Sequence, residues 1–260
     1  MLFYDLHPAV TAFSTERHCS AAKAPYDGFN ITPYTGDDAA HVEGCKQLLC
    51  DLLHIDDRHL VVPHQIHGTQ IAEITTENLG SSLEGIDAVV TQLPDTCIGV
   101  STADCVPIVI YDGRNRAIAA IHAGWRGTVA RIASKTLTFM SERYGTRPED
   151  VKAAIGPSIG PDAFEVGDEV VDAFANAGYD IASLAFRNSR WHINLWEANA
   201  TDLKSAGLDA KSIDIAGLCT FANPTRFFSA RRLGINSGRM FTGCLIADSC
   251  TINAELQKQL

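Results

Sequence analysis

The stretch "STADCVPIVIYDGRNRAIAAIHAGWRG", residues 101–127, contains two apolar runs, "VPIVIY" and "RAIAAIH", separated by the turn sequence "DGRN". This pattern predicts a β-hairpin in which Gly113 is free to take a positive φ. A turn centred between Gly113 and Arg114 places Cys105 directly opposite His122, with Cβ atoms about 5 Å apart. A thiolate and an imidazole at this separation can share a metal ion or form a Cys–His catalytic pair, although each can also be buried for packing alone.

A metal ion needs further ligands, and the segment "VPHQIHG", residues 62–68, offers His64 and His67. On an extended chain, residues three apart point to opposite sides, so only one of the two histidines should reach the site. Pro63 and Gly68 argue against a helix that would bring both to one side. Two histidines and one cysteine form a zinc ligand set with a position left open for water or substrate, and zinc lowers the pKa of bound water toward about 7.

Composition indicates a globular protein that binds small molecules. The chain has 260 residues, of which 46% are hydrophobic and 20% charged, and its net charge is −10. An acidic protein without a Lys/Arg cluster is not expected to bind nucleic acid. No apolar run predicts a membrane span, and the first residues lack the pattern of a secretory signal, so we expect a cytoplasmic protein without a membrane partner. Scattered cysteines without a Cys-x-x-Cys pair are expected to be reduced thiols: Cys19, Cys45, Cys50, Cys97, Cys105, Cys219, Cys244 and Cys250.

Strand and helix patterns alternate without a regular β-α-β order, which favours an α+β fold over a doubly wound sheet. We therefore predict a single domain over residues 1–260, with mixed β-sheets packed with helices. Besides the hairpin, the predicted strands are 60–62, 70–74, 87–91, 97–101, 151–155, 212–217, 226–232 and 240–247. Four helices are predicted. Asp37 or Asp38 caps the first, which has Val42, Cys45, Leu49 and Leu52 on one face. The others run from Gly127 to Gly145, from Asp168 to Gly178, and over 196–207.

Two segments offer candidate substrate contacts. "AGWRGT", residues 123–128, joins a strand end to a helix start, where amides and the Arg126 guanidinium could bind an anion. A plain turn with a surface arginine is the alternative. If 226–232 is a strand, Phe227, Ser229 and Arg231 share one face, and a ring and a guanidinium could hold a purine and a phosphate. The phenylalanines could equally belong to the core, with the arginines on a solvated edge.

Taken together, five motifs resemble, in the same order, those of the laccase-domain family. They are "HQIHG" (64–68), "STADCVP" (101–107), "AAIHAGWRGT" (119–128), "AAIGPSIGPDAFEVG" (153–167) and "CTFANPTRFFSARR" (219–232). The resemblance extends from "FSTER" at 13–17 to "GRMFTG" at 238–243. This family was once labelled polyphenol oxidase and is understood as zinc-dependent purine nucleoside phosphorylases. It implies a mixed α+β sandwich in one domain.

The resemblance also implies a site and an activity. The metal ligands of the family match His67, Cys105 and His122, whereas His64 matches no ligand position. The implied cofactor is Zn²⁺, with Cu²⁺ as the alternative ion. The implied reactions are phosphorolysis of adenosine, inosine and 5′-methylthioadenosine to the free base and ribose 1-phosphate, and deamination of adenosine. The implied partners are therefore a purine nucleoside and phosphate.

Physical roles can be suggested for the residues around this set. Arg126 and Arg231 are candidates to position phosphate, and Asp104 and Glu165 are candidate general acids that help the purine leave. The expected catalytic residues are Cys105, His122 and Asp104, and the expected substrate contacts are Arg126, Ser229 and Arg231. One departure concerns the N-terminal loop, where Cys19 and Ser20 stand at positions that are usually glycine in the family, although Asn30 still matches.

Three other functions compete with this interpretation. A copper polyphenol oxidase would need several His-x-His pairs for a multinuclear centre, and the sequence has none. A hydrolase could use Cys105 as nucleophile and His122 as base. A non-enzymatic zinc protein would close its site with a fourth protein ligand.

Overall fold

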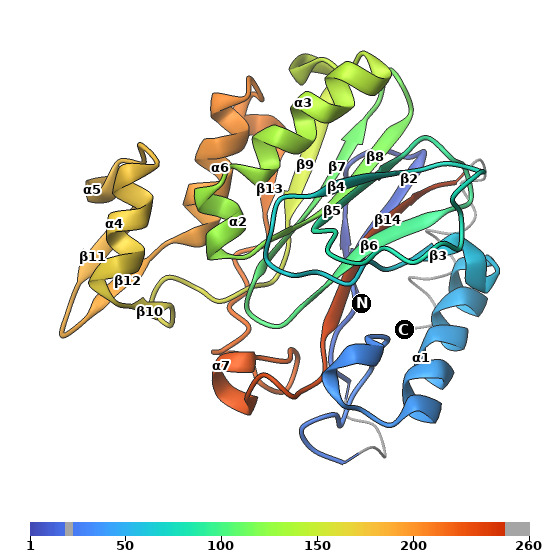
Figure 1. Cartoon of the computed structure of the whole chain (residues 1–260), viewed down its shortest axis with the longest axis horizontal. Helices are drawn as coiled ribbons and strands as arrows, with labels where there is room; N and C mark the ends of the chain where they lie inside the picture. Colours follow the sequence, from blue (N-terminus) through green and yellow to red (C-terminus); the bar gives the residue numbers. More distant parts are fainter. Residues whose placement is uncertain (19–22, 248–260) are drawn as a thin grey trace.

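Two large β-sheets packed face to face, with helices on their outer sides, form the centre of the molecule (Figure 1). The computed structural model describes residues 1–18 and 23–247, so Cys19, Ser20 and Cys250 lie outside the described residues. Both large sheets combine antiparallel and parallel strand pairs. This arrangement confirms the predicted α+β fold with mixed sheets.

The sheets are built from strands that are distant in sequence. The first sheet has the order β1 (Leu2–Tyr4), β2 (Val10–Ser14), β14 (Met240–Ile246), β6 (Cys97–Thr102) and β3 (Leu60–Val61). The second has the order β13 (Ile213–Ile215), β9 (Val151–Ile155), β7 (Val106–Asp112), β8 (Ala117–Ala123), β5 (Ala88–Thr91) and β4 (Ile71–Ile74). A small third sheet contains β10 (Glu165–Val166), β12 (Trp191–Ile193) and β11 (Ala185–Arg187).

The helices lie on the outer faces of the two large sheets and at one end of the molecule (Figure 1). The α-helices are α1 (Ala39–Leu53), α2 (Trp125–Val129), α3 (Ile132–Tyr144), α4 (Asp168–Asn176), α5 (Ile181–Leu184), α6 (Leu195–Ser205) and α7 (Ala230–Leu233). Short 3₁₀ helices cover Pro33–Thr35, Asp57–His59, Pro148–Asp150 and Ala210–Ser212. Within the described residues, no helix combines the length and the apolar character that a membrane span requires. The described cysteines are all free thiols.

Alternation along β7 explains the layered packing. Ile108 and Ile110 face one way and pack in a cluster with side chains of α3, α4 and α6. Val109 and Tyr111 face the other way and pack against the first large sheet. Because both faces of β7 are covered, its side chains are apolar on both sides, as expected for a fully buried strand.

Helix α1 covers the outer face of the first sheet. As predicted, Asp38 caps its N-terminus by accepting hydrogen bonds from the amides of Ala40 and His41. Leu49 and Leu53 then pack in one cluster with side chains of β2, β6 and β14. The helix thereby holds its N-terminal turn in a fixed place relative to β14.

The predicted hairpin forms, but its register differs from the prediction. His122 lies opposite Pro107, and Cys105 falls in the bend just before β7. The register differs by two residues, and since side chains alternate with a period of two, the face of each residue is unchanged. Cys105 and His122 therefore still lie close together, as described below.

The turn chemistry explains this difference. The carboxylate of Asp112 accepts hydrogen bonds from the amides of Arg114 (2.9 Å) and Asn115 (3.0 Å), and the loop runs from Gly113 to Arg116. The positive φ falls on Arg116 (+50°) and not on Gly113, where the sequence allowed it. A side chain that caps its own turn thus sets the loop length and, with it, the strand pairing.

Two further predictions are wrong in detail. The helix expected from Gly127 to Gly145 is two helices, α2 and α3, separated at Arg131, whose φ is +61°. The segment 226–232 is not a strand, because its chain bends into α7 after Phe227 and Phe228, which are fully buried. The other predicted strands and helices are confirmed within a few residues, whereas β1, β2, α5 and the three strands of the small sheet were not predicted.

The hairpin turn generates a stability prediction. Asp112→Ala should lower the free energy of unfolding by about 1–3 kcal/mol, because two loop amides lose their buried acceptor. Urea denaturation followed by circular dichroism measures this loss. Asp162→Ala, at an exposed position, is the matched control and should change the free energy of unfolding by less than about 0.5 kcal/mol. Equal stabilities of the two variants would contradict this account of the turn.

Candidate active site

A cavity of about 820 Å³ contains all three residues that the sequence suggested as metal ligands. Its walls come from segments that are far apart in the chain, including the bend before β7, the end of β8 and the segment before β14. Aromatic, hydroxyl and cationic side chains also line it: Tyr34, His64, Ser101, Thr102, Trp125, Phe164, Arg231 and Arg239. A cavity of this size and mixed polarity suits a small organic molecule.

His67, Cys105 and His122 converge in this cavity. Their potential ligand atoms all lie within 4.8 Å of one another. The rings of His67 and His122 meet edge to face, with centroids 4.8 Å apart. In residues 1–18 and 23–247, this is the one such group of His, Cys, Asp or Glu side chains.

Two residues with left-handed backbone conformations orient the ligands. His67, in the loop between β3 and β4, has a φ of +63°, and Asp104, directly before Cys105, has a φ of +90°. Left-handed conformations are uncommon for residues other than glycine, so both turns must be held by surrounding contacts. His64, by contrast, points its ring at Tyr34 (centroids 4.2 Å apart) and bonds Glu84 through Nδ1 (2.5 Å).

Asp87, directly before β5, ties both histidines together. Its fully buried carboxylate accepts hydrogen bonds from His122 Nδ1 (2.7 Å) and from the amides of His67 (2.9 Å) and Gly68 (2.7 Å). The bond to Nδ1 leaves Nε2 of His122 for the cavity. A carboxylate behind a histidine in this way fixes the ring and raises its basicity as a ligand.

The electrostatics of the group favour a thiolate. Burial alone would raise the pKa of Cys105, but the neighbouring His122 and His67 lower it to about 6. Burial would lower the pKa of His122, but Cys105 and Asp87 raise it to about 9. Burial would raise the pKa of Asp87, yet the hydrogen bonds from His122 and the loop amides hold it below its usual range. At pH 7 the metal-free site therefore holds a thiolate beside an imidazolium.

Gly124 supports the fit of a metal ion. A Cβ at this position would lie 3.0 Å from His67 Cδ2 and 3.1 Å from Cys105 Sγ, so any other residue would crowd the two ligands. One thiolate and two imidazoles are a donor set that Zn²⁺ prefers, and three protein ligands are typical of catalytic zinc sites. His67, Cys105 and His122 can thus hold a divalent ion such as zinc.

Asp104 and Ser229 form a buried network beside the ligands. Asp104 Oδ1 accepts a hydrogen bond from Thr220 Oγ1 (2.6 Å), and Oδ2 accepts from Ser229 Oγ (3.0 Å) and from the amide of Arg231 (2.7 Å). These bonds hold the left-handed turn that presents Cys105. They also explain why the chain bends at Ser229 instead of continuing as a strand.

The remaining candidate residues are placed differently. Arg231 lines the cavity, and its Nη2 donates to the carbonyl oxygen of Glu165 (3.1 Å). The side chain of Glu165 pairs with Arg190 (3.1 Å) and is not among the described residues that line the cavity. Arg126 is exposed and lies over the ring of Trp125 (4.3 Å), so the structure does not bring its guanidinium into the cavity.

Comparison with known proteins places this site in a family. The family model described as multi-copper polyphenol oxidoreductase laccase matches residues 11–247. The chain belongs to this family. The predicted resemblance to laccase-domain proteins is therefore confirmed.

Relatives of this laccase-domain chain carry names other than copper oxidoreductase. A purine nucleoside phosphorylase of Bacteroides thetaiotaomicron is 42% identical over 247 residues, covering 91% of this chain and 92% of the relative. Adenosine deaminase RL5, from an unknown prokaryotic organism, is 44% identical over 244 residues, covering 90% and 93%. The solved structure of YlmD from Geobacillus stearothermophilus superposes with a TM-score of 0.88 at 28% identity, covering 94% of each chain.

Two important residues of this laccase-domain site were missed by sequence reasoning. Asp87 is a carboxylate at the start of an apolar strand, and such a residue in a buried position needs several hydrogen bonds. That pattern could have marked it as a structural or functional residue. Arg239 carries no comparable local signal, since only the fold brings it to the cavity.

The hydrogen bonds of Asp87 predict its contribution to metal binding. Asp87→Asn should weaken zinc binding by about 10- to 100-fold, because the amide cannot accept from His122 and two backbone amides as the carboxylate does. Competition with a chromophoric chelator measures the dissociation constant. Asp209→Asn, the same substitution at an exposed position, should leave it unchanged. An unaltered affinity of Asp87→Asn would show that the carboxylate does not orient the ligands.

Proton release on metal binding provides a second prediction. Between pH 7 and 9 the metal-free site holds the Cys105 thiolate and the His122 imidazolium, and coordination requires the neutral ring. Zinc binding at pH 7 should therefore release about one proton from this pair, and the affinity should rise by about tenfold per pH unit up to pH 9. Calorimetry in buffers of different ionisation enthalpy measures the released proton. Affinity that does not change over this range would contradict the assigned charge state.

Proposed function

We propose that this chain is a zinc-dependent purine nucleoside phosphorylase that also deaminates adenosine. The observation that carries the proposal is the set of His67, Cys105 and His122 at the wall of a cavity of about 820 Å³. The names of relatives 42% and 44% identical to it support both reactions. The proposed substrates are a purine nucleoside and inorganic phosphate.

The metal has a defined task in this proposal. A zinc ion bound by His67, Cys105 and His122 would supply Lewis acidity and lower the pKa of bound water toward about 7. The chain itself keeps the thiolate and the rings in place through Asp87, Asp104 and Gly124. Asp104 thus acts as a positioning residue, because its carboxylate already accepts three hydrogen bonds.

The nucleoside can be accommodated by the aromatic walls. Tyr34 and His64 form a pair of rings on the lining of the cavity, and Trp125 and Phe164 also line it. Flat rings of this kind pack well against a purine. The ribose is neutral, whereas phosphate is an anion and needs a cationic partner, and two arginines, Arg231 and Arg239, line the cavity.

Neither of the main alternatives is favoured by these observations. A multinuclear copper oxidase needs several ligand clusters, and the described residues assemble a single group of three. A hydrolase using Cys105 and His122 would not require His67 in the same group. Dependence on the metal distinguishes this hydrolase from the proposed enzyme, since a thiol nucleophile works in the metal-free protein.

The direct test is turnover with defined nucleosides. Purified protein is incubated with inosine or adenosine, with and without phosphate, and the free base, ribose 1-phosphate and ammonia are measured. We expect phosphate-dependent base release from inosine and phosphate-independent ammonia release from adenosine. A chelator should abolish both reactions, and added zinc should restore them.

Single substitutions connect this turnover to the site. Cys105→Ala and His122→Ala should each reduce both activities by more than about 100-fold and lower the zinc content of the purified protein. Cys45→Ala is the matched control, because Cys45 also contacts a histidine (3.6 Å to His41 Nε2) but lies away from the cavity lining. A Cys105→Ala protein with full activity and stoichiometric zinc would refute the proposed function.

A further inference from the structure

We propose that Arg239 is the residue that binds the phosphate co-substrate. This inference rests on the proposed function and assigns a role that sequence reasoning had given to Arg126 and Arg231. Arg239 directly precedes β14 and lines the same cavity as the metal ligands.

The surroundings of Arg239 fix its guanidinium without neutralising it. Nη1 donates to the carbonyl oxygens of Ser237 (2.7 Å) and Gly238 (3.1 Å) and to Ser237 Oγ (3.2 Å), and Nη2 donates to the carbonyl oxygen of Ile235 (2.7 Å). None of these acceptors carries a charge. Within the described part of the chain, Nε makes no hydrogen bond, so at least this donor remains for a ligand.

The absence of a carboxylate partner distinguishes Arg239 from other partly buried arginines. Arg17 pairs with Asp27 (2.5 Å), and Arg131 pairs with Asp202 (3.5 Å). For Arg239, by contrast, residues 1–18 and 23–247 provide no ion pair. Burial lowers the pKa of Arg239, and the nearby groups Cys105 and Asp104 oppose this shift without forming an ion pair with it. A half-buried cation without an ion-pair partner favours an anionic ligand.

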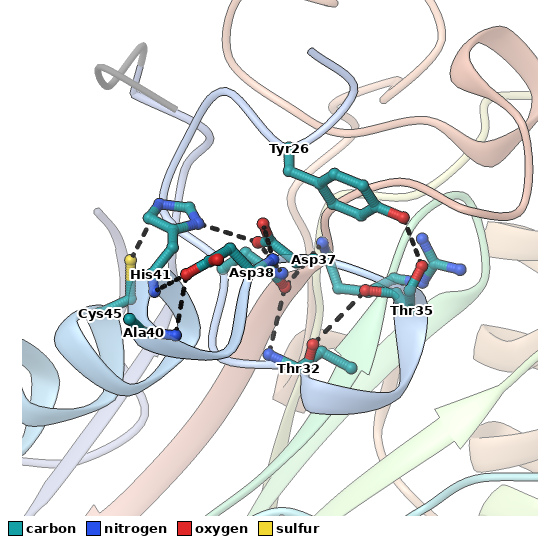
Figure 2. A network of polar contacts seen from close by, with 10 residues as sticks. Tyr26, Thr32, Thr35, Asp37, Asp38, Ala40, His41 and Cys45 are labelled. Atoms are coloured by element: carbon teal, nitrogen blue, oxygen red, sulfur yellow. Dashed lines mark hydrogen bonds and ion pairs between the residues drawn. The ribbon is translucent and has the colours of Figure 1, made fainter. Parts of the chain in front are cut away.

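The backbone of Arg239 is anchored from helix α1. Asn30, which is fully buried, accepts hydrogen bonds on Oδ1 from the amides of Arg239 (3.2 Å) and Thr32 (3.1 Å), and its Nδ2 donates to Asp37 Oδ2 (2.8 Å). Figure 2 shows the next contact, in which Asp37 faces His41 on the first turn of α1 (2.9 Å). A site that is held in place before the ligand arrives binds it with a smaller loss of entropy.

Thr102 is a further polar residue of the cavity wall, and its hydroxyl has no hydrogen-bond partner among the described residues. The residue is only 2% exposed. Thr102 lies opposite Met240, the residue that follows Arg239, and it lines the same cavity. A buried hydroxyl without a partner is costly, so a ligand with acceptor oxygens near Arg239 would satisfy it.

The two proposed reactions differ in their need for phosphate, and this difference can identify a phosphate-binding residue. In phosphorolysis, a phosphate oxygen forms a bond to C1′, the C1′–N9 bond breaks with its electron pair on the purine, and the proton of hydrogen phosphate passes to the purine. In deamination, water replaces the amino group of adenosine at C6, and ammonia leaves. Phosphate takes part only in the first reaction, so loss of its binding residue should change the balance between the two activities.

The test is the steady-state kinetics of Arg239→Gln with inosine and varied inorganic phosphate. We expect KM for phosphate to rise by about 10- to 100-fold, as for the loss of charge-assisted hydrogen bonds. The ratio of adenosine deamination to inosine phosphorolysis should rise by a similar factor. Arg239→Lys keeps the positive charge but loses the paired N–H donors of the guanidinium. It should therefore bind phosphate more tightly than Arg239→Gln and less tightly than the wild type.

The control and a binding measurement complete the test. Arg231→Gln removes the other arginine of the cavity lining, and we expect a smaller change in KM for phosphate, because Arg231 is exposed to solvent whereas Arg239 is half-buried. Inorganic phosphate should raise the melting temperature of the wild-type protein above that in chloride at equal ionic strength, and Arg239→Gln should lose this shift. Thr102→Val should also raise KM for phosphate.

An active wild-type enzyme whose KM for phosphate is unchanged in Arg239→Gln would overturn the inference, whereas a wild-type protein without either activity would overturn the proposed function.

Discussion

The carboxylate of Asp87 is the interaction on which the candidate active site depends. It binds Nδ1 of His122 at the end of β8 and the amides of the loop that carries His67. Two ligands that are 55 positions apart in the sequence therefore share one rigid acceptor. Because this acceptor is fully buried, the loop cannot move away without leaving a buried carboxylate oxygen without its hydrogen-bond donors. The position of His67, in a left-handed conformation on an otherwise irregular segment, is thus fixed by the residue directly before β5.

Part of this site could be predicted because hairpins have few possible geometries. The apolar runs on either side of "DGRN" were enough to bring Cys105 and His122 together, even though the predicted register was wrong. The register depended on Asp112, whose side chain sets the loop length and cannot be deduced from strand periodicity. The choice between His64 and His67 was also beyond periodicity, since it depends on a φ of +63° at His67. Only the resemblance to the laccase-domain family identified His67 as the ligand.

The parts that could not be predicted are those that depend on distant contacts. The segment 226–232 has the apolar and alternating pattern of a strand, yet Ser229 and Arg231 bend around Asp104, which is more than a hundred residues earlier in the chain. A local pattern contains no information about such a partner. The same limit applies to Arg126 and Arg239. Arg126 follows a ligand-bearing strand but lies over Trp125, whereas Arg239 reaches the cavity because β14 pairs with β6.

The overall charge of the molecule makes the cavity cations more important. With a net charge of −10, the protein repels an anion such as phosphate at long range, so the molecule as a whole does not steer phosphate to the site. At physiological ionic strength this repulsion is screened beyond about 8 Å, and binding is then decided by groups inside the cavity. Asp104 lines the cavity, but its carboxylate is bonded to Thr220, Ser229 and the amide of Arg231. The guanidinium groups of Arg231 and Arg239 therefore determine whether the cavity attracts an anion, while a neutral nucleoside is held by the surrounding rings.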